Sequence, residues 1–407
     1  MRGEGTVIGE ILRTLDEVPE LFARLDQEIT LERANRYLSA LESVPAPSQT
    51  ARWGRTRVVE RLLDEDGVLD EARVGWEHDI AAGGSAALTL GGERRAKRVW
   101  LLAHLDQISY ALDPGTHPIY PLVPLCFHMQ RSGRQPALAV GHDLATGTIV
   151  VRARGEIVVD GPGITFDAAD DTPLGPGTRV IYDPRFAWNR GTGALVGQLD
   201  DTVACTAMLL AAGVLRHYPV EVLIGLTDEE EGAPGDANQS FCRGGRRLVR
   251  LFDPPELAIV SDVHESEAML RGPGPRDLHL GDGAVFAERS SSGRGTVTPP
   301  HLYAFQQAMA ESLRERDILL RENWGGYVSR SEDINAAIVT PNIALIGFLC
   351  SNRHYATDRP RAHMGDLLHL ARVFVCYTLL VHSDLWRRVT QTHAEGKSER
   401  LWQEVNH

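Results

Sequence analysis

Side chains that bind metal ions recur at the ends of apolar, strand-like runs along this 407-residue chain. In an open α/β sheet, ligands collect outside the carboxyl ends of the strands. Side chains that are remote in sequence can therefore converge on one point. In chain order, the residues expected to converge are His104 with Asp106, Asp200 with Asp201, Glu229 with Glu230, then Asp262, and finally His354.

The bulk composition excludes several classes of protein. A formal net charge of −13 argues against a nucleic-acid-binding protein, which usually carries a basic face. The longest apolar run, residues 373–381, is shorter than the about 20 residues that a membrane span needs. The five cysteines lack zinc-knuckle spacing and fit reduced thiols. We therefore expect a soluble, cytoplasmic protein that has no nucleic-acid or membrane partner.

The alternation of helical and strand-like patterns predicts an α/β catalytic domain in two segments, residues 29–113 and 197–390. Between them, residues 114–196 show short β-like runs and frequent turn signals, which predict an inserted small β-barrel or sandwich. Residues 1–28 are expected to form a charged helical N-terminal extension and residues 391–407 a polar tail. Ser48, after a proline-rich stop, is predicted to cap the helix that follows it.

Two of the candidate sites are pairs of residues. His104 is followed by Asp106, and a metal-ligating imidazole usually donates its second ring N–H to an acceptor of this kind. A buried structural His–Asp pair fits the same pattern. Asp200 and Asp201 precede an apolar helix predicted over residues 203–215. One carboxylate there can ligate two cations, or both acids can simply cap the helix.

The sharpest signal is a run of four acids, Asp228 to Glu231, that follows an apolar strand and precedes Gly232. Four negative charges at the end of a buried strand destabilise the fold unless cations neutralise them. Glu229 and Glu230 can point in different directions, one toward a metal ion and one toward the reacting water. A solvated acidic turn is the alternative. Asp262 ends another apolar strand, where a lone Asp can also form a turn.

The sequence alone does not determine which histidine is the last metal ligand. His354 follows a predicted strand, His363 is its rival, and a surface histidine fits the sequence as well. His264 lies two residues after Asp262 and is expected to support the site or the fold. Glu332 and Asp333 are expected to lie in a surface turn, with a position lining the substrate pocket as the alternative.

In this order, the motifs resemble those of metallopeptidase family forty-two, the glutamyl and tetrahedral aminopeptidases of clan MH. Members typically show His-Met-Asp-Glu-Ile-Gly where this chain has His104-Leu105-Asp106-Gln107-Ile108-Ser109. Leu-Asp-Asp-Arg corresponds to Leu199-Asp200-Asp201-Thr202, and Glu-Glu-x-Gly corresponds to residues 229–232. The resemblance covers roughly residues 30–385, including the inserted β unit.

The resemblance implies a mixed, mainly parallel sheet flanked by helices, as in zinc peptidases, with an inserted small β-barrel or PDZ-like domain. It also implies two divalent metal ions, with zinc preferred and cobalt or manganese as alternatives. The implied ligands are His104 and Asp262 for one ion, Glu230 and His354 for the other, and Asp200 as the bridge.

The resemblance implies further roles for individual residues. Glu229 would be the general base that activates a water, Asp106 would orient His104, and the Asp200–Asp201 peptide bond would be cis. The chain departs from the family pattern at Gln107, at Thr202 and in lacking His-Ser-Pro after the final strand.

The expected function is a homo-oligomeric metallo-aminopeptidase that removes N-terminal residues from peptides, with the inserted β unit mediating self-association. The alternatives are a related amidohydrolase, deacylase or carboxypeptidase-like enzyme, or a homologue without catalytic activity.

Overall fold

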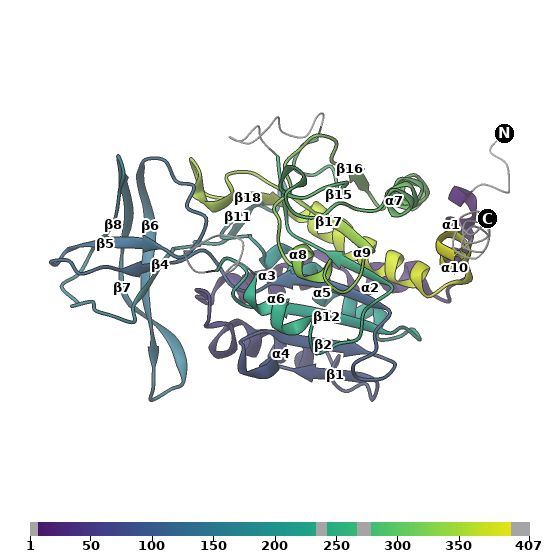
Figure 1. Ribbon diagram of the computed structural model, residues 1–407, viewed down its shortest axis with the longest axis horizontal. Helices are drawn as coiled ribbons and strands as arrows, with labels where there is room; N and C mark the ends of the chain where they lie inside the picture. The colour runs from purple at the N-terminus through teal and green to yellow at the C-terminus, as the bar shows by residue number, and fades with distance from the viewer. Residues whose placement is uncertain (1–6, 233–241, 267–277, 392–407) are drawn as a thin grey trace, which may run out of the picture.

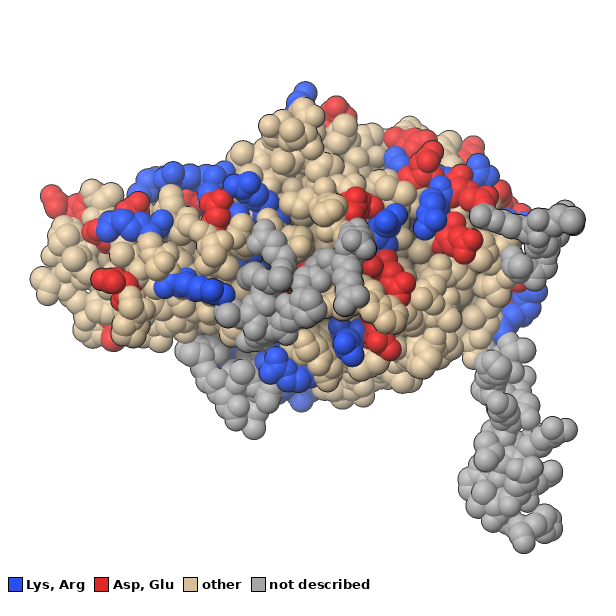
Figure 2. All heavy atoms as spheres, turned by 90° about the horizontal axis from the view of Figure 1, so that it is seen from above, with Lys and Arg blue, Asp and Glu red and all other residues tan. Residues whose placement is uncertain are grey.

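The computed structural model of the chain describes residues 7–232, 242–266 and 278–391. A large α/β part carries a β-barrel that projects from one end, and helices α1 (Val7–Asp16) and α10 (Asp384–Gln391) lie at the opposite end (Figure 1). Beyond Gln391, the expected polar tail lies outside the described residues. On the face seen in Figure 2, acidic and basic side chains of the described residues are interspersed.

Within the described residues, a nine-stranded mixed sheet forms the centre of the α/β part. Its central strands β12, β3, β13 and β17 are parallel neighbours, and antiparallel pairs flank them. Across the sheet the strands are β1 (Val74–Glu77), β2 (Ala86–Leu90), β12 (Val222–Thr227), β3 (Val99–His104), β13 (Leu257–Val260), β17 (Ile343–Cys350), β15 (Ala284–Ala287) and β16 (Leu320–Glu322), with β14 (Val263–Glu265) paired to β17.

Helices cover both faces of this sheet, and β3 shows why its sequence is apolar throughout. Val99 and Leu101 pack into the core shared with α5 and α9, whereas Trp100 and Leu102 pack into the core under α6 and α8. A strand that is buried on both faces has no polar alternation. The remaining helices are α2 (Leu21–Glu28), α3 (Leu31–Glu42), α4 (Arg55–Glu65), α5 (Thr202–Leu215), α6 (Arg243–Leu248), α7 (Pro300–Leu313), α8 (Asp333–Ala336) and α9 (Met364–Val381).

Helix α9 is long and apolar enough, by length and composition, to cross a membrane. However, 78 % of it is buried inside the fold, where it packs against α5, β15 and β17. Its apolar sequence is thus accounted for by the core that it closes.

The inserted unit is a closed antiparallel barrel of six strands. Its core contains Ile157, Phe166 and Tyr182. The barrel strands are β4 (Tyr110–Leu112), β5 (Ile119–Pro124), β6 (Gly133–Asp143), β7 (Thr148–Asp160), β8 (Gly163–Ala168) and β9 (Arg179–Tyr182). Strands β10 (Ala187–Trp188) and β11 (Ala194–Val196) also lie within the expected insertion, but they pair with β18 (Arg361–His363) in a separate three-stranded sheet.

The fully buried side chain of Arg55, in α4, ties the end of α3 to the loop after β3. Its guanidinium donates to the carbonyl oxygens of Leu41 (3.1 Å), Val44 (3.3 Å) and Leu105 (2.6 Å). It also donates to Oε1 of Gln107 (3.3 Å), the residue that stands where the family usually has an acid. Burial lowers the pKa of Arg55, and carbonyl dipoles hold its charge.

We predict that Arg55→Met lowers the free energy of unfolding by about 3 kcal/mol, because several buried carbonyl oxygens lose their donor. Urea denaturation of the two proteins measures the difference. Arg57→Met, on an exposed position of the same helix, is the matched control and should change stability little. Equal losses for the two variants would contradict the role given to Arg55.

Candidate metal centre

The ends of the four parallel strands β12, β3, β13 and β17 bring the acidic and histidine residues together. Strands β12 and β3 pair with Thr227 opposite His104, so the acids after Thr227 start beside this histidine. The Leu105 N–H donates to the Thr227 carbonyl oxygen (2.7 Å), which continues the pairing beyond the strands. Asp262 follows β13 in the same layer. The convergence expected from the strand ends is therefore present.

His104 is completely surrounded by protein and faces three carboxylates. Its Nδ1 lies 3.1 Å from the backbone carbonyl oxygen of Asp106. Its Nε2 lies 3.2 Å from Oδ1 of Asp200, 3.8 Å from Oε2 of Glu230 and 4.0 Å from Oδ2 of Asp262. Because a carbonyl oxygen only accepts, Nδ1 carries the proton, and Nε2 of a neutral ring is a bare acceptor.

His354 has the same arrangement of contacts as His104 and faces the other oxygen of Asp200. Its Nδ1 lies 2.7 Å from the carbonyl oxygen of Phe127, in the segment that follows barrel strand β5. Its Nε2 lies 3.0 Å from Oε1 of Glu231 and 3.3 Å from Oδ2 of Asp200. Of the two candidate histidines, it is His354 that lies beside Asp200. His363 lies elsewhere, with Nε2 on the Thr192 carbonyl oxygen and Nδ1 capping α9.

These contacts pair acceptors with acceptors and require positive charge between them. Oε1 of Glu231 is buried and has no hydrogen-bond partner among the described residues. Two groups of buried side chains could each hold a cation: His104 with Asp200 and Glu231, and His104 with Glu230 and Asp262. The two oxygens of Asp200 face different histidines, which is the arrangement of a carboxylate shared between two ions. Nitrogen and carboxylate donors suit zinc and similar divalent metals.

Buried protons can take the place of cations in this cluster. Burial lowers the pKa of His354, but the charge of Glu231 and the hydrogen bonds that the protonated ring would donate to Asp200 and Glu231 outweigh burial and raise that pKa to about 9. Burial, reinforced by the charge of Asp200, raises the pKa of Asp262 to about 7. Burial also raises the pKa of Glu230 well above its usual value. These raised pKa values mean that the cluster favours bound protons when no cation neutralises it.

The run of acids enters the site one residue later than expected. The Glu229 carboxylate forms ion pairs with Arg243 (2.6 Å) and Arg247, both in α6, and the structure does not bring it to the two histidines. Glu229 has a positive φ of 62°, so the chain turns sharply there. Glu230 and Glu231 then point inward, and it is Glu231 that meets His354. The motif Glu-Glu-x-Gly matches Glu229 and Glu230 by spacing and therefore gives no signal for Glu231.

Asp106 fixes the acidic turn in addition to contacting His104. Its two carboxylate oxygens accept the backbone N–H groups of Glu230 (3.0 Å) and Glu231 (3.2 Å). Its Oδ1 lies 3.6 Å from Nδ1 of His104, so it stands beside the ring that it was expected to orient. The Ser48 hydroxyl donates to the same carboxylate. The expected helix cap at Ser48 is wrong, since α4 begins only at Arg55 and Ser48 instead serves Asp106.

The Asp200–Asp201 peptide bond is cis, as the resemblance implies. Glu42, at the end of α3, accepts the N–H of Gln198 (2.8 Å) and the hydroxyl of Thr202 (2.7 Å), and so holds this segment from both sides. Asp201 occupies the N-cap position of α5, but its side chain forms no capping hydrogen bond. Thr202, which replaces the usual Arg, therefore has a structural partner of its own.

Two other expectations concern residues around the cluster. Glu332 and Asp333 are fully buried, so the expected surface turn is wrong: Glu332 accepts from the Thr227 hydroxyl, and Asp333 accepts from Thr296 (2.7 Å). Their polar partners inside the fold explain why these acids are buried. His264 is buried against Asn323 (3.0 Å), and burial lowers its pKa to about 3, which fits a supporting residue.

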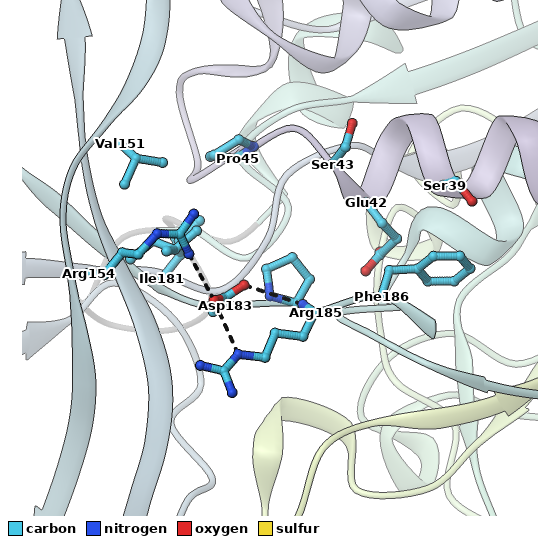
Figure 3. Close-up of a pocket in the computed structure, with 12 residues that line it drawn as sticks. Ser39, Glu42, Ser43, Pro45, Val151, Arg154, Ile181, Asp183, Arg185 and Phe186 are labelled. Carbon is cyan, nitrogen blue, oxygen red and sulfur yellow. Dashed lines mark hydrogen bonds and ion pairs between the residues drawn. The ribbon is translucent and has the colours of Figure 1, made fainter. Parts of the chain in front are cut away.

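A separate pocket of about 400 Å³ lies between the end of α3 and the barrel (Figure 3). Arg154 and Arg185 both pair with the carboxylate of Asp183 inside it, at 3.3 and 3.4 Å. Its lining residues include none of the candidate ligands. Glu42 borders this pocket and also supports the Asp200 segment.

No model of a protein family matches the sequence, and no match is found among curated proteins. Solved structures do match. A TET aminopeptidase from the marine sediment archaeon Thaumarchaeota archaeon SCGC AB-539-E09 is 12 % identical, with a TM-score of 0.68 over 88 % of this chain and 99 % of that one. Aminopeptidase APDkam598 from the archaeon Desulfurococcus kamchatkensis is 16 % identical, with a TM-score of 0.65 over 85 % and 94 %.

The Pyrococcus horikoshii TET1 peptidase, which can assemble into a tetrahedron or a large octahedral shell, is 15 % identical, with a TM-score of 0.63 over 85 % of this chain and 99 % of that one. The chain therefore has the fold of the TET aminopeptidases, at a large distance in sequence.

Proposed function

We propose that the protein is a two-metal aminopeptidase. The observation that carries this proposal is the pair of buried histidines whose Nε2 atoms face the two oxygens of Asp200 from opposite sides. The fold shared with aminopeptidases of known structure supports the reaction class. We further propose zinc as the metal, a homo-oligomeric assembly, and a cytoplasmic location. The assembly is supported by the similar P. horikoshii peptidase, which can assemble into a tetrahedron or a large octahedral shell.

Each ion would be held by residues from different strand ends. His104 and Asp262 would hold one ion, His354 and Glu231 the other, and Asp200 would bridge them. This changes one ligand from the set that the resemblance implies, because Glu231 and not Glu230 contacts His354. Bound divalent cations would lower the pKa of a water and polarise the scissile carbonyl group.

Glu230 then remains as the carboxylate available for proton transfer. It lies beside His104 and Asp262, and its Oε1 accepts a hydrogen bond from the Cys242 thiol (3.4 Å). In our proposal Glu230 takes the proton of the attacking water and passes it to the leaving amine. Glu229 was expected in this role, but its ion pairs with two arginines hold it away from the histidines.

Carboxypeptidase-like or deacylase activity would use the same centre on a different substrate. N-terminal aminoacyl anilides and N-acyl amino acids distinguish these activities, because only an aminopeptidase needs a free amino group next to the scissile bond. A homologue without activity would hydrolyse neither class, and undetectable metal after supplementation with zinc or cobalt would favour it.

We predict that the metal-free protein binds zinc with release of protons. A cation needs neutral imidazole, and the raised pKa of His354, about 9, keeps that ring protonated at lower pH. Apparent affinity should therefore rise with pH up to that value, by about tenfold per unit for each displaced proton. Titration calorimetry in two buffers at about pH 7 and about pH 8.5 measures both effects. His279→Ala, at an exposed position, should behave like the wild type. Binding that is independent of pH would contradict a site built on His354.

We predict different outcomes for three neighbouring glutamates. Glu230→Gln should keep two metal ions per chain and lose at least about 100-fold in kcat, the typical contribution of a general base. Glu231→Gln should lose metal, and Glu229→Gln should retain most activity. Elemental analysis and hydrolysis of aminoacyl anilides give the two readouts. If Glu229→Gln were inactive while Glu230→Gln turned over normally, the general base would be Glu229.

A further inference from the structure

Arg353 lies directly beside the candidate metal centre and has no part in the proposed mechanism. It opens the short turn η5 (Arg353–Tyr355) after β17. Its neighbours Asn352, His354 and Tyr355 have positive φ values of 56°, 54° and 56°. The Tyr355 ring stacks on Tyr182 of the barrel, with centroids 3.9 Å apart and planes 10° from parallel. Non-glycine residues keep such a backbone only where surrounding contacts fix it. The turn therefore aims Arg353 in a defined direction.

The guanidinium of Arg353 points at the metal-binding atoms. Its Nε donates to Oε1 of Glu265 (3.2 Å), and its Nη1 lies 3.2 Å from Nε2 of His354. The residue is only 8 % exposed. The other oxygen of Glu265 is buried and has no partner in the described part of the chain. Arg353 is thus a buried cation at the edge of the site. It is held by Glu265, and only one of the two oxygens of this carboxylate has a hydrogen-bond partner among the described residues.

Placing a cation here opposes the binding of two further cations, because like charges repel at short range. Glu265 offsets that repulsion but does not explain why the arginine is present. A metal ion on Nε2 of His354 would also take the lone pair that Nη1 of Arg353 faces. That N–H group would then need another acceptor within the site. A guanidinium suits a carboxylate, because its planar N–H groups match two oxygens at once.

We propose that Arg353 binds a carboxylate of the substrate close to the scissile amide, and that Glu265 holds the guanidinium in place when no substrate is bound. This inference rests on the proposed function and names its substrate class. Such a carboxylate has two sources: the free α-carboxylate of a dipeptide, or the acidic side chain of an N-terminal residue.

Equilibrium binding of reaction products tests Arg353 without any turnover. Titration calorimetry on the zinc-loaded, full-length protein compares three compounds with a free amino group. Leucine carries an α-carboxylate, glutamic acid α-amide carries only a side-chain carboxylate, and leucinamide carries neither. At least one carboxylate ligand should bind about tenfold more tightly than leucinamide, the value of a charge-assisted hydrogen bond. Whichever of leucine and glutamic acid α-amide binds more tightly identifies the source of the carboxylate that Arg353 recognises.

Variants separate recognition from structural support. Arg353→Gln should remove the preference while leaving leucinamide binding within about twofold. Glu265→Gln keeps the hydrogen-bond acceptor but removes the competing charge, so it should strengthen carboxylate binding by about threefold. Arg361→Gln, at an exposed position of β18 with its own partner Asp358 (2.8 Å), is the matched control and should change nothing.

Repeating the titrations on metal-free protein separates Arg353 from the ions, since carboxylates also bind zinc. Equal affinity of the wild type for all three compounds would overturn the proposal. A uniform loss for all three in Arg353→Gln would overturn it too, since that result marks a purely structural residue. Absence of hydrolysis with every peptide would refute the proposed function, while the binding data would still decide the role of Arg353.

Discussion

The structure depends on one interaction: the carboxylate of Asp200 lies between two imidazole nitrogens that are both bare acceptors in the neutral ring. Each histidine commits its other nitrogen to a backbone carbonyl oxygen, so neither ring can turn a proton toward the carboxylate without becoming charged. With Glu230, Glu231 and Asp262 buried around them, the cluster has far more negative than positive charge. In a low-dielectric interior this arrangement is stable only with cations or bound protons.

The scaffold around this interaction comes from both parts of the molecule. The α/β part supplies the strand ends and the carboxylates of Glu42 and Asp106, which hold the approaching segments by their N–H groups. The barrel supplies the Phe127 carbonyl oxygen on His354 and the Tyr182 ring under Tyr355. The inserted unit therefore contributes to the candidate site, and its removal would disturb His354.

Much of this could be predicted from the sequence. Apolar strands followed by acids or histidines indicate the edge of the sheet where ligands gather, which brings together His104, Asp200, Asp262 and His354. The choice between Glu229, Glu230 and Glu231 could not be predicted, because it depends on the left-handed turn at Glu229 and on arginines that follow later in the chain. The burial of Glu332 depends likewise on a partner, Thr227, that is remote in sequence.

The most direct measurement is anomalous diffraction from crystals of the full-length protein grown with zinc. We expect two peaks about 3.5–4 Å apart, one between His104 and Asp262 and the other between His354 and Glu231, with the Asp200 carboxylate touching both. Zinc-replete crystals with no peak at this cluster, or with zinc bound only elsewhere, would contradict it.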